Sequence, residues 1–361
     1  MTVKNVGTPA PKSVIAKSTW PKKELADAHL EAMLFCGFGC IYCSSNKGAR
    51  LRFLKRLIRE QISKLLGKPF KPMDGTDVGV FYENIAQHLE TELRGLKRRP
   101  GLGQTLVYSQ LTDGFSPVLL RRGTPRRILE LLLEHTDYRI RILTKNAIVG
   151  NKTWRSFFKQ HAERFVVGLS IGSLDKKFTS RMEKHTSAPL ARVAALSKLQ
   201  EAGISTYGML CPVFPQVVFT DQLEQLVDSI NAQQCEKVWF EPFNARGNWR
   251  QVREVYGEKT EMWDWFTDVH ENRNTRKWSD YAATLYQRVY AKAAEEGWQG
   301  KLRYLLYESA IDPDHVSHFG NLDGVLLQSP SDEQGFSKHA GFAELQQRLC
   351  QTATEQPAVV L

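Results

Sequence analysis

The chain has 361 residues, 42% of them hydrophobic, and a formal net charge of +10. This composition allows a large core, in one barrel-sized domain or in two smaller ones. No run of about 18 apolar residues is present, which excludes a membrane-spanning helix, and the first residues lack the apolar stretch of a signal peptide. We therefore expect a cytoplasmic protein with no membrane partner, whose cysteines are not paired in disulfides.

Residues 1–30 are rich in lysine, proline and serine and predict a flexible N-terminal arm. The apolar run over residues 32–35 then predicts a strand. Directly after it, Cys36, Cys40 and Cys43 follow in the spacing C-x3-C-x2-C, with Tyr42 before the last. Three thiolates on one short loop can ligate three irons of a cubane cluster, which leaves the fourth iron open for a small chelating molecule.

Zinc and haem fit these cysteines less well than a cluster does. A zinc site needs a fourth ligand, usually from a second pair downstream, and none follows. Haem attachment needs a histidine directly after Cys43, where Ser44 stands. The loop therefore predicts a [4Fe–4S] cluster held by Cys36, Cys40 and Cys43.

Much of the positive charge follows this loop. The basic residues there are Lys47, Arg50, Arg52, Lys55, Arg56, Arg59, Lys64, Lys68 and Lys71, and smaller basic groups lie at 97–99 and 121–127. Such clusters are typical of proteins with a polyanionic partner such as nucleic acid. Apolar residues also recur at helical spacing from Leu51 to Leu65, which fits a solvated helix face. Nucleic acid bound through Lys47–Lys71 is one hypothesis, and a charged helix surface is the alternative.

From residue 77 to residue 241, strand and helix patterns alternate. Strands are predicted over 77–82, 105–111, 139–143, 165–171, 204–210 and 237–241, and helices over 84–96, 125–135, 153–161, 187–203 and 221–232. Ser187 is the predicted N-cap of the helix over 187–203, and Gly203 its stop. Strands that alternate with helices imply parallel βα units, and about six of them make a full or partial barrel.

Beyond residue 244 the alternation fades. Trp249, Trp263, Trp265 and Trp278 punctuate a charged region that contains a predicted helix over 278–296 and a strand over 301–306. We expect these rings to pack as core, with stacking on a substrate as the alternative. The predicted organisation is an arm over 1–30, a partial (βα)6-type barrel over 31–245, a helical extension over 246–350 that completes or covers it, and a disordered tail over 351–361.

In parallel βα folds, functional residues gather at the C-terminal ends of the strands. This rule nominates polar residues that follow successive predicted strands. They are Thr112, Asp113, Thr144, Lys145, Ser170, Cys211 and Glu241. The cysteine loop follows the first predicted strand, so we expect it at the same mouth of the barrel.

From the cysteines to about Gly247, the sequence resembles the spore photoproduct lyase-like branch of the radical S-adenosylmethionine superfamily. The resemblance is carried by the cysteine motif and by five segments in the same order, namely LTDGFSP at 111–117, ILTK at 142–145, VGLSI at 167–171, the run over 188–204 and LCPVFP at 210–215. It implies an α/β partial parallel barrel in which the open iron binds the amino and carboxylate groups of S-adenosylmethionine.

The resemblance also implies roles for single residues near that cofactor. Lys145 would pair with the carboxylate of S-adenosylmethionine, as an ammonium at a strand end can. Ser170 would hydrogen-bond to the ribose, and Tyr42 would pack beside the adenine. A surface lysine and a backbone-bonded serine are the structural alternatives for the first two.

Four further residues would shape the same pocket. Thr112 and Asp113 would lie near the methionine moiety, although Asp113 before Gly114 also suits a turn. Arg192 would anchor a wall of the site, with an exposed helix arginine as the alternative. Glu241 would orient substrate or ribose, with a salt bridge to Arg246 as the alternative.

Two positions depart from this branch. Leu111 stands where a hydrogen-donating cysteine is expected, and Ser44 stands where a tyrosine is expected after the third cluster cysteine. Repair of thymine photoproducts by that route is therefore not expected. Cys211, at another strand end, is a candidate hydrogen donor, with a buried structural cysteine as the alternative.

The implied activity is reductive cleavage of S-adenosylmethionine to methionine and a 5′-deoxyadenosyl radical that abstracts hydrogen from a substrate. An electron donor such as flavodoxin or ferredoxin would reduce the cluster. The basic segment favours a nucleic acid or nucleotide as substrate, and a small metabolite or natural-product precursor is the alternative. A noncatalytic, metal-containing nucleic-acid-binding protein is a further hypothesis, which predicts a closed four-ligand metal site.

Overall fold

The computed structural model of the protein describes residues 3–18, 23–43, 56–70, 78–244, 248–306, 311–319 and 323–327. Its main sheet has nine strands, which lie in the order β12 (Val325–Leu327), β11 (Leu302–Leu306), β10 (Cys235–Pro242), β9 (Thr206–Val213), β8 (Phe165–Ser170), β7 (Arg139–Thr144), β6 (Thr105–Tyr108), β3 (Ala28–Leu30) and β2 (Ile15–Lys17). Neighbouring strands are parallel except β2 and β3, which are antiparallel. The carboxyl ends of the parallel strands therefore all lie at the same end of the sheet.

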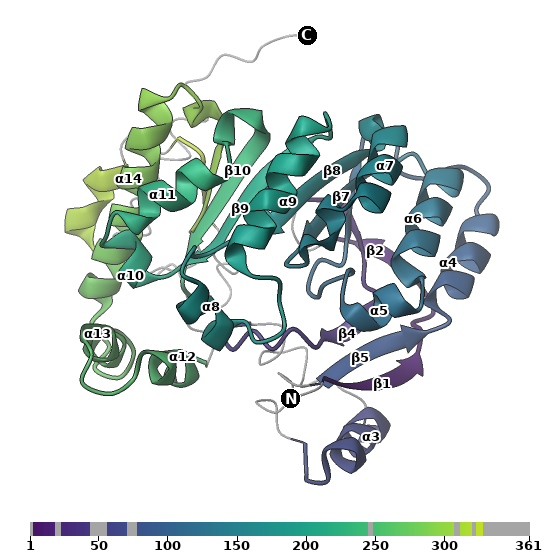
Figure 1. Cartoon of the computed structure of the whole chain (residues 1–361), viewed down its shortest axis with the longest axis horizontal. Helices are drawn as coiled ribbons and strands as arrows, with labels where there is room; N and C mark the ends of the chain where they lie inside the picture. Colours follow the sequence, from purple (N-terminus) through teal and green to yellow (C-terminus); the bar gives the residue numbers. More distant parts are fainter. Residues whose placement is uncertain are drawn as a thin grey trace.

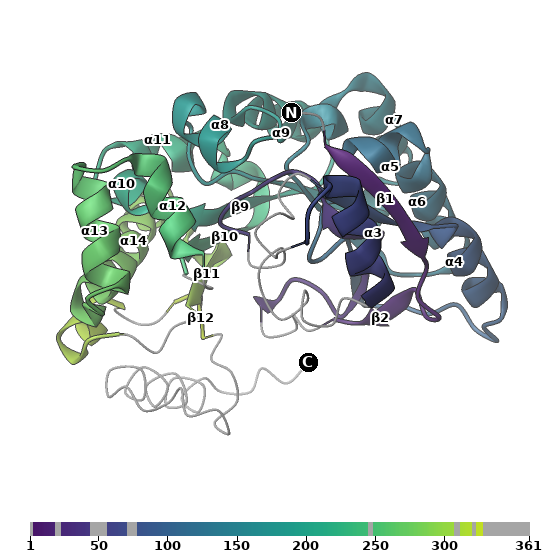
Figure 2. The ribbon, with the colours of Figure 1, turned by 90° about the horizontal axis from the view of Figure 1, so that it is seen from below.

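Helices follow these strands along the chain, and most of them cover the outer, convex face of the curved sheet (Figures 1 and 2). They are α4 (Ile85–Arg94), α5 (Pro117–Arg121), α6 (Thr124–His135), α7 (Lys152–Gln160), α8 (Lys176–Met182), α9 (Pro189–Glu201), α10 (Pro215–Val218), α11 (Gln222–Ser229), α12 (Trp249–Tyr256), α13 (Glu261–His270) and α14 (Thr275–Glu295). Short 3-10 turns lie at Ala147–Gly150, Ala162–Arg164, Ala232–Gln234, Gln299–Lys301 and Pro313–Phe319. Among the described residues, we find no helix with the length and apolar character needed to cross a membrane.

The core fills the layer between sheet and helices. Ile128 and Leu132 of α6, for example, are fully buried in one cluster with Ile140 and Ile142 of β7. A second, smaller cluster fills the inner face of the sheet, where Tyr207 of β9 meets aromatic and aliphatic residues of neighbouring strands. Both faces of the central strands are thus apolar, as parallel sheets require.

The structure confirms the predicted α/β class and the partial parallel barrel. From β6 to β10, the predicted strands and the helices between them are present, and their ends shift by only a few residues. The sheet is open, with β2 and β12 at its edges. Because β11 and β12 continue the parallel order beyond β10, the chain after residue 246 adds strands to the sheet as well as helices.

The N-terminal region differs from the flexible arm predicted over 1–30. It contributes β2 and β3 to the main sheet and β1 (Lys4–Pro9) to a separate sheet in the order β1-β5-β4, with β5 at Val78–Glu83 and β4 at Met33–Cys36. Pairing with neighbouring strands satisfies the backbone N–H and C=O groups of these polar segments. Composition alone does not reveal this pairing. The predicted strand before the cysteines is β4, but it belongs to this small sheet, and β3 takes its expected place in the main sheet.

The small sheet is covered by the amphipathic helix α3 (Arg56–Leu66), which lies within the basic segment. Ile62 of α3 is buried with Phe35, Val78 and Val80 of the sheet. The described basic residues of this helix, Arg56, Arg59 and Lys64, are exposed. The apolar spacing thus predicted a helix correctly, whereas Lys47–Lys55, Lys71 and the tail over 351–361 lie outside the described residues.

The helix predicted over 187–203 starts two residues later than expected, as α9. Its N-cap is Ala188 and its first residue is Pro189. The hydroxyl of Ser187 instead accepts a hydrogen bond of 2.9 Å from the backbone N–H of Ala147. The capping prediction was therefore wrong, because Ser187 stabilises the turn after β7 and not the helix itself. Gly203 follows the helix with φ of +72°, as the predicted stop should.

Candidate active site

The cysteine loop leaves β4 and turns at two glycines. Gly37 and Gly39 have φ of +73° and +69°, a region that residues with a Cβ rarely adopt. This explains the sequence C-G-F-G-C, in which glycines alternate with larger residues. Along the loop, Cys40 is buried, while Cys36 and Cys43 are partly accessible. All three are free cysteines in the structure.

The three thiols are the type of ligand that the predicted cluster needs. Burial raises the pKa of Cys36 to about 12, with the nearby Cys43 adding to the effect, and burial also raises the pKa of Cys40. The thiols of Cys36 and Cys40 are therefore protonated at neutral pH, whereas bound iron would stabilise their thiolate form. Among the described residues, no three His, Cys, Asp or Glu side chains converge as ligands of a single ion. A cubane needs no such convergence, because each thiolate binds a different iron.

One cavity joins this loop to the strand ends. It has a volume of about 260 Å³ and is lined by residues from the cysteine loop and from the ends of β7, β8, β9 and β10. The predicted site residues in its lining are Tyr42, Cys43, Lys145, Ser170, Cys211 and Glu241. Apolar side chains complete the wall, among them Leu25, Leu111, Leu143, Met209 and Leu305. The topology thus brings together residues that are far apart in the sequence.

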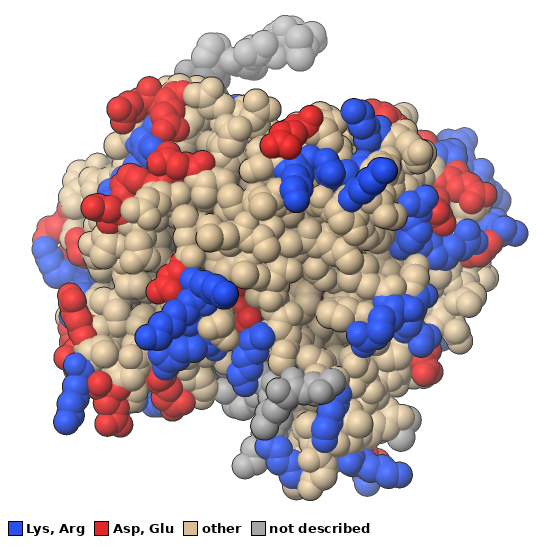
Figure 3. All heavy atoms as spheres, viewed as in Figure 1, with Lys and Arg blue, Asp and Glu red and all other residues tan. Residues whose placement is uncertain are grey.

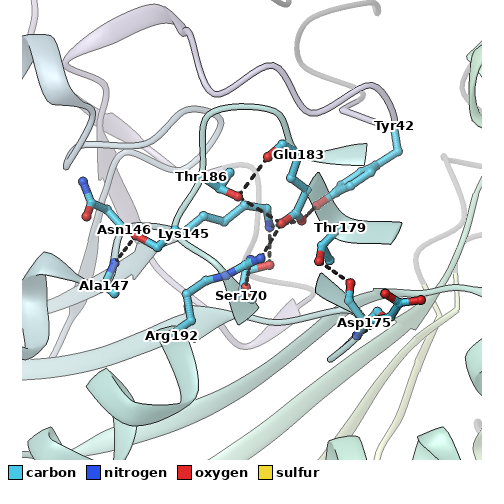
Figure 4. Close-up of polar contacts among 12 residues, drawn as sticks. Tyr42, Lys145, Asn146, Ala147, Ser170, Asp175, Thr179, Glu183, Thr186 and Arg192 are labelled. Carbon is cyan, nitrogen blue, oxygen red and sulfur yellow. Dashed lines mark hydrogen bonds and ion pairs between the residues drawn. The ribbon is translucent and has the colours of Figure 1, made fainter. Parts of the chain in front are cut away.

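A cluster of charged groups lies at one wall of the cavity (Figure 4). The ammonium of Lys145 donates to the hydroxyl of Ser170 at 2.5 Å and lies 3.6 Å from a carboxylate oxygen of Glu183. The guanidinium of Arg192 lies 2.5 Å from the other oxygen of Glu183 and donates to the carbonyl of Ser170 at 2.6 Å. Two cations share one carboxylate, so one positive charge is not balanced within this set. Because Lys145 faces the cavity, it can take an anionic group.

Arg192 itself is fully buried behind this wall, so the exposed-arginine alternative is wrong. It lies on the inner stripe of α9 with Ala195, Leu196 and Leu199. Burial alone would raise the pKa of Glu183, but Lys145 and Arg192 outweigh burial and hold that pKa below its usual value. The carboxylate is therefore charged at neutral pH.

Sequence reasoning missed Glu183 altogether. The residue follows α8 and not a strand, so the strand-end rule does not reach it. The spacing of Arg192 with Leu196 and Leu199 carries the one available signal, since it places an arginine on an apolar helix stripe. A buried arginine requires an anionic partner. The sequence does not say which carboxylate supplies it.

Thr112 and Asp113 lie just outside the cavity lining. The carboxylate of Asp113 accepts hydrogen bonds from the hydroxyl of Thr144 at 2.8 Å and from the backbone N–H of Lys145 at 2.8 Å. Thr112 donates to Glu31 at 2.8 Å. Asp113 therefore ties the turn after β6 to the end of β7. Asp113 thus reaches the cavity only through the backbone of Lys145. Its carboxylate also accepts from the N–H of Phe115 at 2.9 Å, which fits the alternative role of Asp113 as a turn residue.

Cys211 and Glu241 both face the cavity. Burial raises the pKa of Cys211, and the charge of Glu241 adds to this, so the thiol holds its proton at neutral pH. A carboxylate oxygen of Glu241 accepts a hydrogen bond of 3.1 Å from Asn244. Arg246, the expected alternative partner of Glu241, lies outside the described residues.

The four tryptophans of the C-terminal region divide into two pairs. Trp265 and Trp278 are each 4% exposed, so for them the core prediction is confirmed. Trp249 and Trp263 are partly exposed and lie beside arginines. The guanidinium of Arg253 is 5.2 Å from the ring of Trp249 and 4.2 Å from that of Trp263. Trp249 still packs against the main core cluster, and both rings of this second pair carry a guanidinium beside them.

Comparison with known proteins agrees with the geometry. No family model matches the chain. Among solved structures, the fold is similar to that of spore photoproduct lyase. One variant of that lyase gives a TM-score of 0.51 at 16% identity, over 90% of this chain and 81% of the lyase. A second variant gives 0.50 at 16% identity, over 90% and 82%. These likenesses establish the fold.

One curated relative also matches. An uncharacterised protein of Acidianus two-tailed virus is 24% identical over 165 residues, which are 44% of this chain and 53% of the viral protein. The chain thus spans about half the length of the curated relative that it matches.

Proposed function

We propose that this protein is a radical S-adenosylmethionine enzyme with a [4Fe–4S] cluster held by Cys36, Cys40 and Cys43. The observation that carries the proposal is the single cavity that joins the cysteine loop to Lys145 at a neighbouring strand end. A cluster ligand and a carboxylate-binding lysine on one cavity suit a molecule that chelates iron and carries a carboxylate. The fold shared with spore photoproduct lyase supports the same assignment.

With cluster and cofactor bound, one-electron reduction of S-adenosylmethionine supplies methionine and a 5′-deoxyadenosyl radical that abstracts hydrogen from the substrate. The chain's own residues orient and enclose the reactants. Lys145 would pair with the cofactor's carboxylate. The hydroxyl of Ser170 accepts from Lys145 and donates to the carbonyl of Cys211 at 3.1 Å, so it can accept a further hydrogen bond from a hydroxyl group. Leu111, Leu143 and Leu305 keep the wall apolar and exclude water.

Cys211 is the proposed hydrogen donor: its thiol would give a hydrogen atom to the product radical, and one electron from the same external donor that reduces the cluster, with one proton, would restore the resulting thiyl radical to the thiol. Its thiol lines the same cavity and keeps its proton, because burial raises its pKa. A thiolate has no hydrogen atom to give, so a raised pKa suits this role. Glu241, beside it in the lining, is placed to orient a polar group of the substrate.

The proposed substrate is a nucleic acid or a nucleotide. Beside the cysteine loop, α8 and the residues after it carry exposed Lys176, Lys177, Arg181 and Lys184. Figure 3 shows a group of basic side chains over the position of α8. A basic rim next to a reactive cavity suits a phosphate backbone. The alternative, a small metabolite, is favoured by the modest volume of about 260 Å³ and its apolar wall.

The decisive test is anaerobic reconstitution with iron and sulfide, followed by addition of dithionite and S-adenosylmethionine. We expect 5′-deoxyadenosine from the wild-type protein and from Cys235→Ala, which removes a buried cysteine at the start of β10. Cys40→Ala should yield neither cluster nor 5′-deoxyadenosine. Full iron loading without S-adenosylmethionine binding would favour the noncatalytic alternative. A flavodoxin or ferredoxin should replace dithionite as the physiological reductant.

A further inference from the structure

Glu183 connects the cysteine loop to the rest of the site through its backbone. Its position pairs with Cys40 as an isolated antiparallel bridge. On either side of that bridge, the N–H of Ile41 donates to the carbonyl of Met182 at 3.0 Å, and the N–H of His185 donates to the carbonyl of Phe38 at 3.0 Å. The segment after α8 therefore runs alongside the cysteine loop and holds it like a neighbouring strand.

The side chain of Glu183 turns from this segment into the site (Figure 4). One carboxylate oxygen accepts the hydroxyl of Tyr42 and faces the ammonium of Lys145 at 3.6 Å. The other accepts from Arg192 at 2.5 Å and from the hydroxyl of Thr186 at 3.3 Å. Only 4% of this side chain is exposed, so these contacts are made away from water.

Three structural elements thus meet at one carboxylate. Tyr42 belongs to the cysteine loop, Lys145 follows β7, and Arg192 lies in α9. The ring of Tyr42 is also 5.7 Å from the ammonium of Lys145, so the two groups that face the cavity lie side by side. Without the carboxylate, the buried Arg192 would lose its anionic partner, and Lys145 would keep its contact with Ser170 at this wall but lose its ion pair.

We infer that Glu183 is the positioning residue that fixes Tyr42 and Lys145 relative to the cysteine loop. This inference rests on the proposed function. Glu183 is absent from the cavity lining, so it acts through its neighbours and does not contact the cofactor. Through Lys145 and Tyr42, it would set where the cofactor's carboxylate and adenine lie relative to the cysteine loop. The ammonium that receives the carboxylate is held on one side by Ser170 and on the other by Glu183.

The test compares two glutamate-to-glutamine variants of similar chemistry. Glu183→Gln keeps the size of the side chain but removes its charge. Glu236→Gln does the same at the opposite end of the strands, where Glu236 accepts from Arg139 at 3.0 Å. Both variants weaken an arginine pair, but only Glu183 lies beside the cavity. Glu183→Asp keeps the charge and serves as the rescue variant.

The first measurement is equilibrium binding of S-adenosylmethionine to the reconstituted proteins, with iron content determined alongside. We expect Glu183→Gln to bind at least tenfold more weakly at unchanged iron content, Glu183→Asp to recover part of the affinity, and Glu236→Gln to match the wild type. An affinity of Glu183→Gln within twofold of the wild type would overturn the inference. If the wild-type protein with a full cluster binds no S-adenosylmethionine, the proposed function fails first, and the two failures are thus distinguishable.

The second measurement needs neither metal nor cofactor. Amide hydrogen exchange of the peptide over residues 37–43 reports how firmly the loop is held in the metal-free protein. We expect this peptide to exchange at least tenfold faster in Glu183→Gln than in Glu236→Gln, when both are compared at equal overall stability. Equal rates in the two variants would show that Glu183 stabilises the fold in general and does not position the loop.

Discussion

At the scale of single residues, the site depends on how a few buried charges are balanced. Lys145 is the one cation of the Glu183 cluster that also lines the cavity. Lys145→Met leaves the pair of Glu183 and Arg192 intact, so the fold should persist. A hydrogen bond to a charged group contributes about 1.5–3 kcal/mol, so affinity for S-adenosylmethionine should fall by about tenfold to a hundredfold. Equilibrium dialysis with the reconstituted protein measures this, and an unchanged affinity would rule out the proposed role of Lys145.

The contribution of Arg192 to the stability of the fold can be measured separately from cofactor binding. Arg192→Leu leaves Glu183 with the more distant Lys145 as its remaining ion-pair partner, and removal of one partner of a buried pair costs about 3–5 kcal/mol. Urea unfolding should therefore show a large loss of stability. The matched control is Arg276→Leu, whose side chain is 60% exposed in its pair with Asp314. The control should lose less than about 1 kcal/mol. Equal losses in the two variants would contradict the buried-pair argument.

His270 gives the molecule a pH dependence with a defined sign. Burial lowers the pKa of His270 from 6.5 to about 4. Between about pH 6.5 and pH 4, His270 is therefore protonated in the unfolded chain but neutral in the folded protein. The free energy of unfolding is thus highest above pH 6.5 and falls as the pH is lowered through this range. The loss reaches up to about 3 kcal/mol at pH 4. His270→Phe, which keeps a ring stacked on Trp249, should flatten the urea-unfolding profile over this range. A profile as steep as that of the wild type would argue against His270 as the cause.

At the scale of elements, the sequence predicts best where hydrophobic pattern and length are strong. β8, with all six residues buried, and α6, with its apolar stripe, both follow directly from their patterns. β3 is only three residues long, and its pairing with β6 depends on the rest of the sheet. No local pattern distinguishes such a strand from an irregular arm, which is why the N-terminal prediction was wrong.

In the candidate site, too, the sequence predicts some residues and misses another. The strand-end rule finds Lys145, Ser170, Cys211 and Glu241 because parallel strands deliver their ends to one side of the sheet. Glu183 escapes that rule because a helix and a loop deliver it. Its partnership with Arg192 is a tertiary contact, and single-sequence patterns carry no distance information.

The helix α14 supports the site from behind. The hydroxyl of Tyr281 accepts from the N–H of Phe243 at 2.7 Å and donates to the carbonyl of Val213. Phe243 lines the cavity, and Val213 ends β9. Tyr281→Phe leaves both backbone groups buried and unpaired, so we expect a loss of about 1–3 kcal/mol in unfolding free energy. The control is Tyr290→Phe on the same helix, which removes an exposed hydrogen bond from the Tyr290 hydroxyl to Asp323 and should change the unfolding free energy little. Losses of similar size in both variants would show that Tyr281 does not support the strand ends.

At the scale of the whole molecule, the net charge of +10 is distributed over several surfaces. The group on α8 differs from the others because its helix is bonded to the cysteine loop and packs against α12. On α12, the guanidinium of Arg250 lies 4.5 Å from the ring of Trp249. Cations and an aromatic ring next to one cavity are the features that bind phosphates and stack bases. Arg122 and Arg126 also lie over rings, those of Phe81 and Phe157, but both of these rings are buried.

This difference predicts which charges govern binding of nucleic acid. Neutralising Lys176, Lys177, Arg181 and Lys184 to Gln should weaken binding of single-stranded DNA and flatten the slope of log affinity against log salt by up to about 3, since each neutralised phosphate contributes about 0.7. The control neutralises Lys97, Arg98, Lys159 and Lys198, which are equally exposed and absent from the cavity lining. Both variants lower the net charge equally, so nonspecific attraction alone would make them equal. Equal slopes, or no binding by the wild-type protein, would favour a small metabolite as the substrate and leave the basic surface of α8 as a solvated helix face.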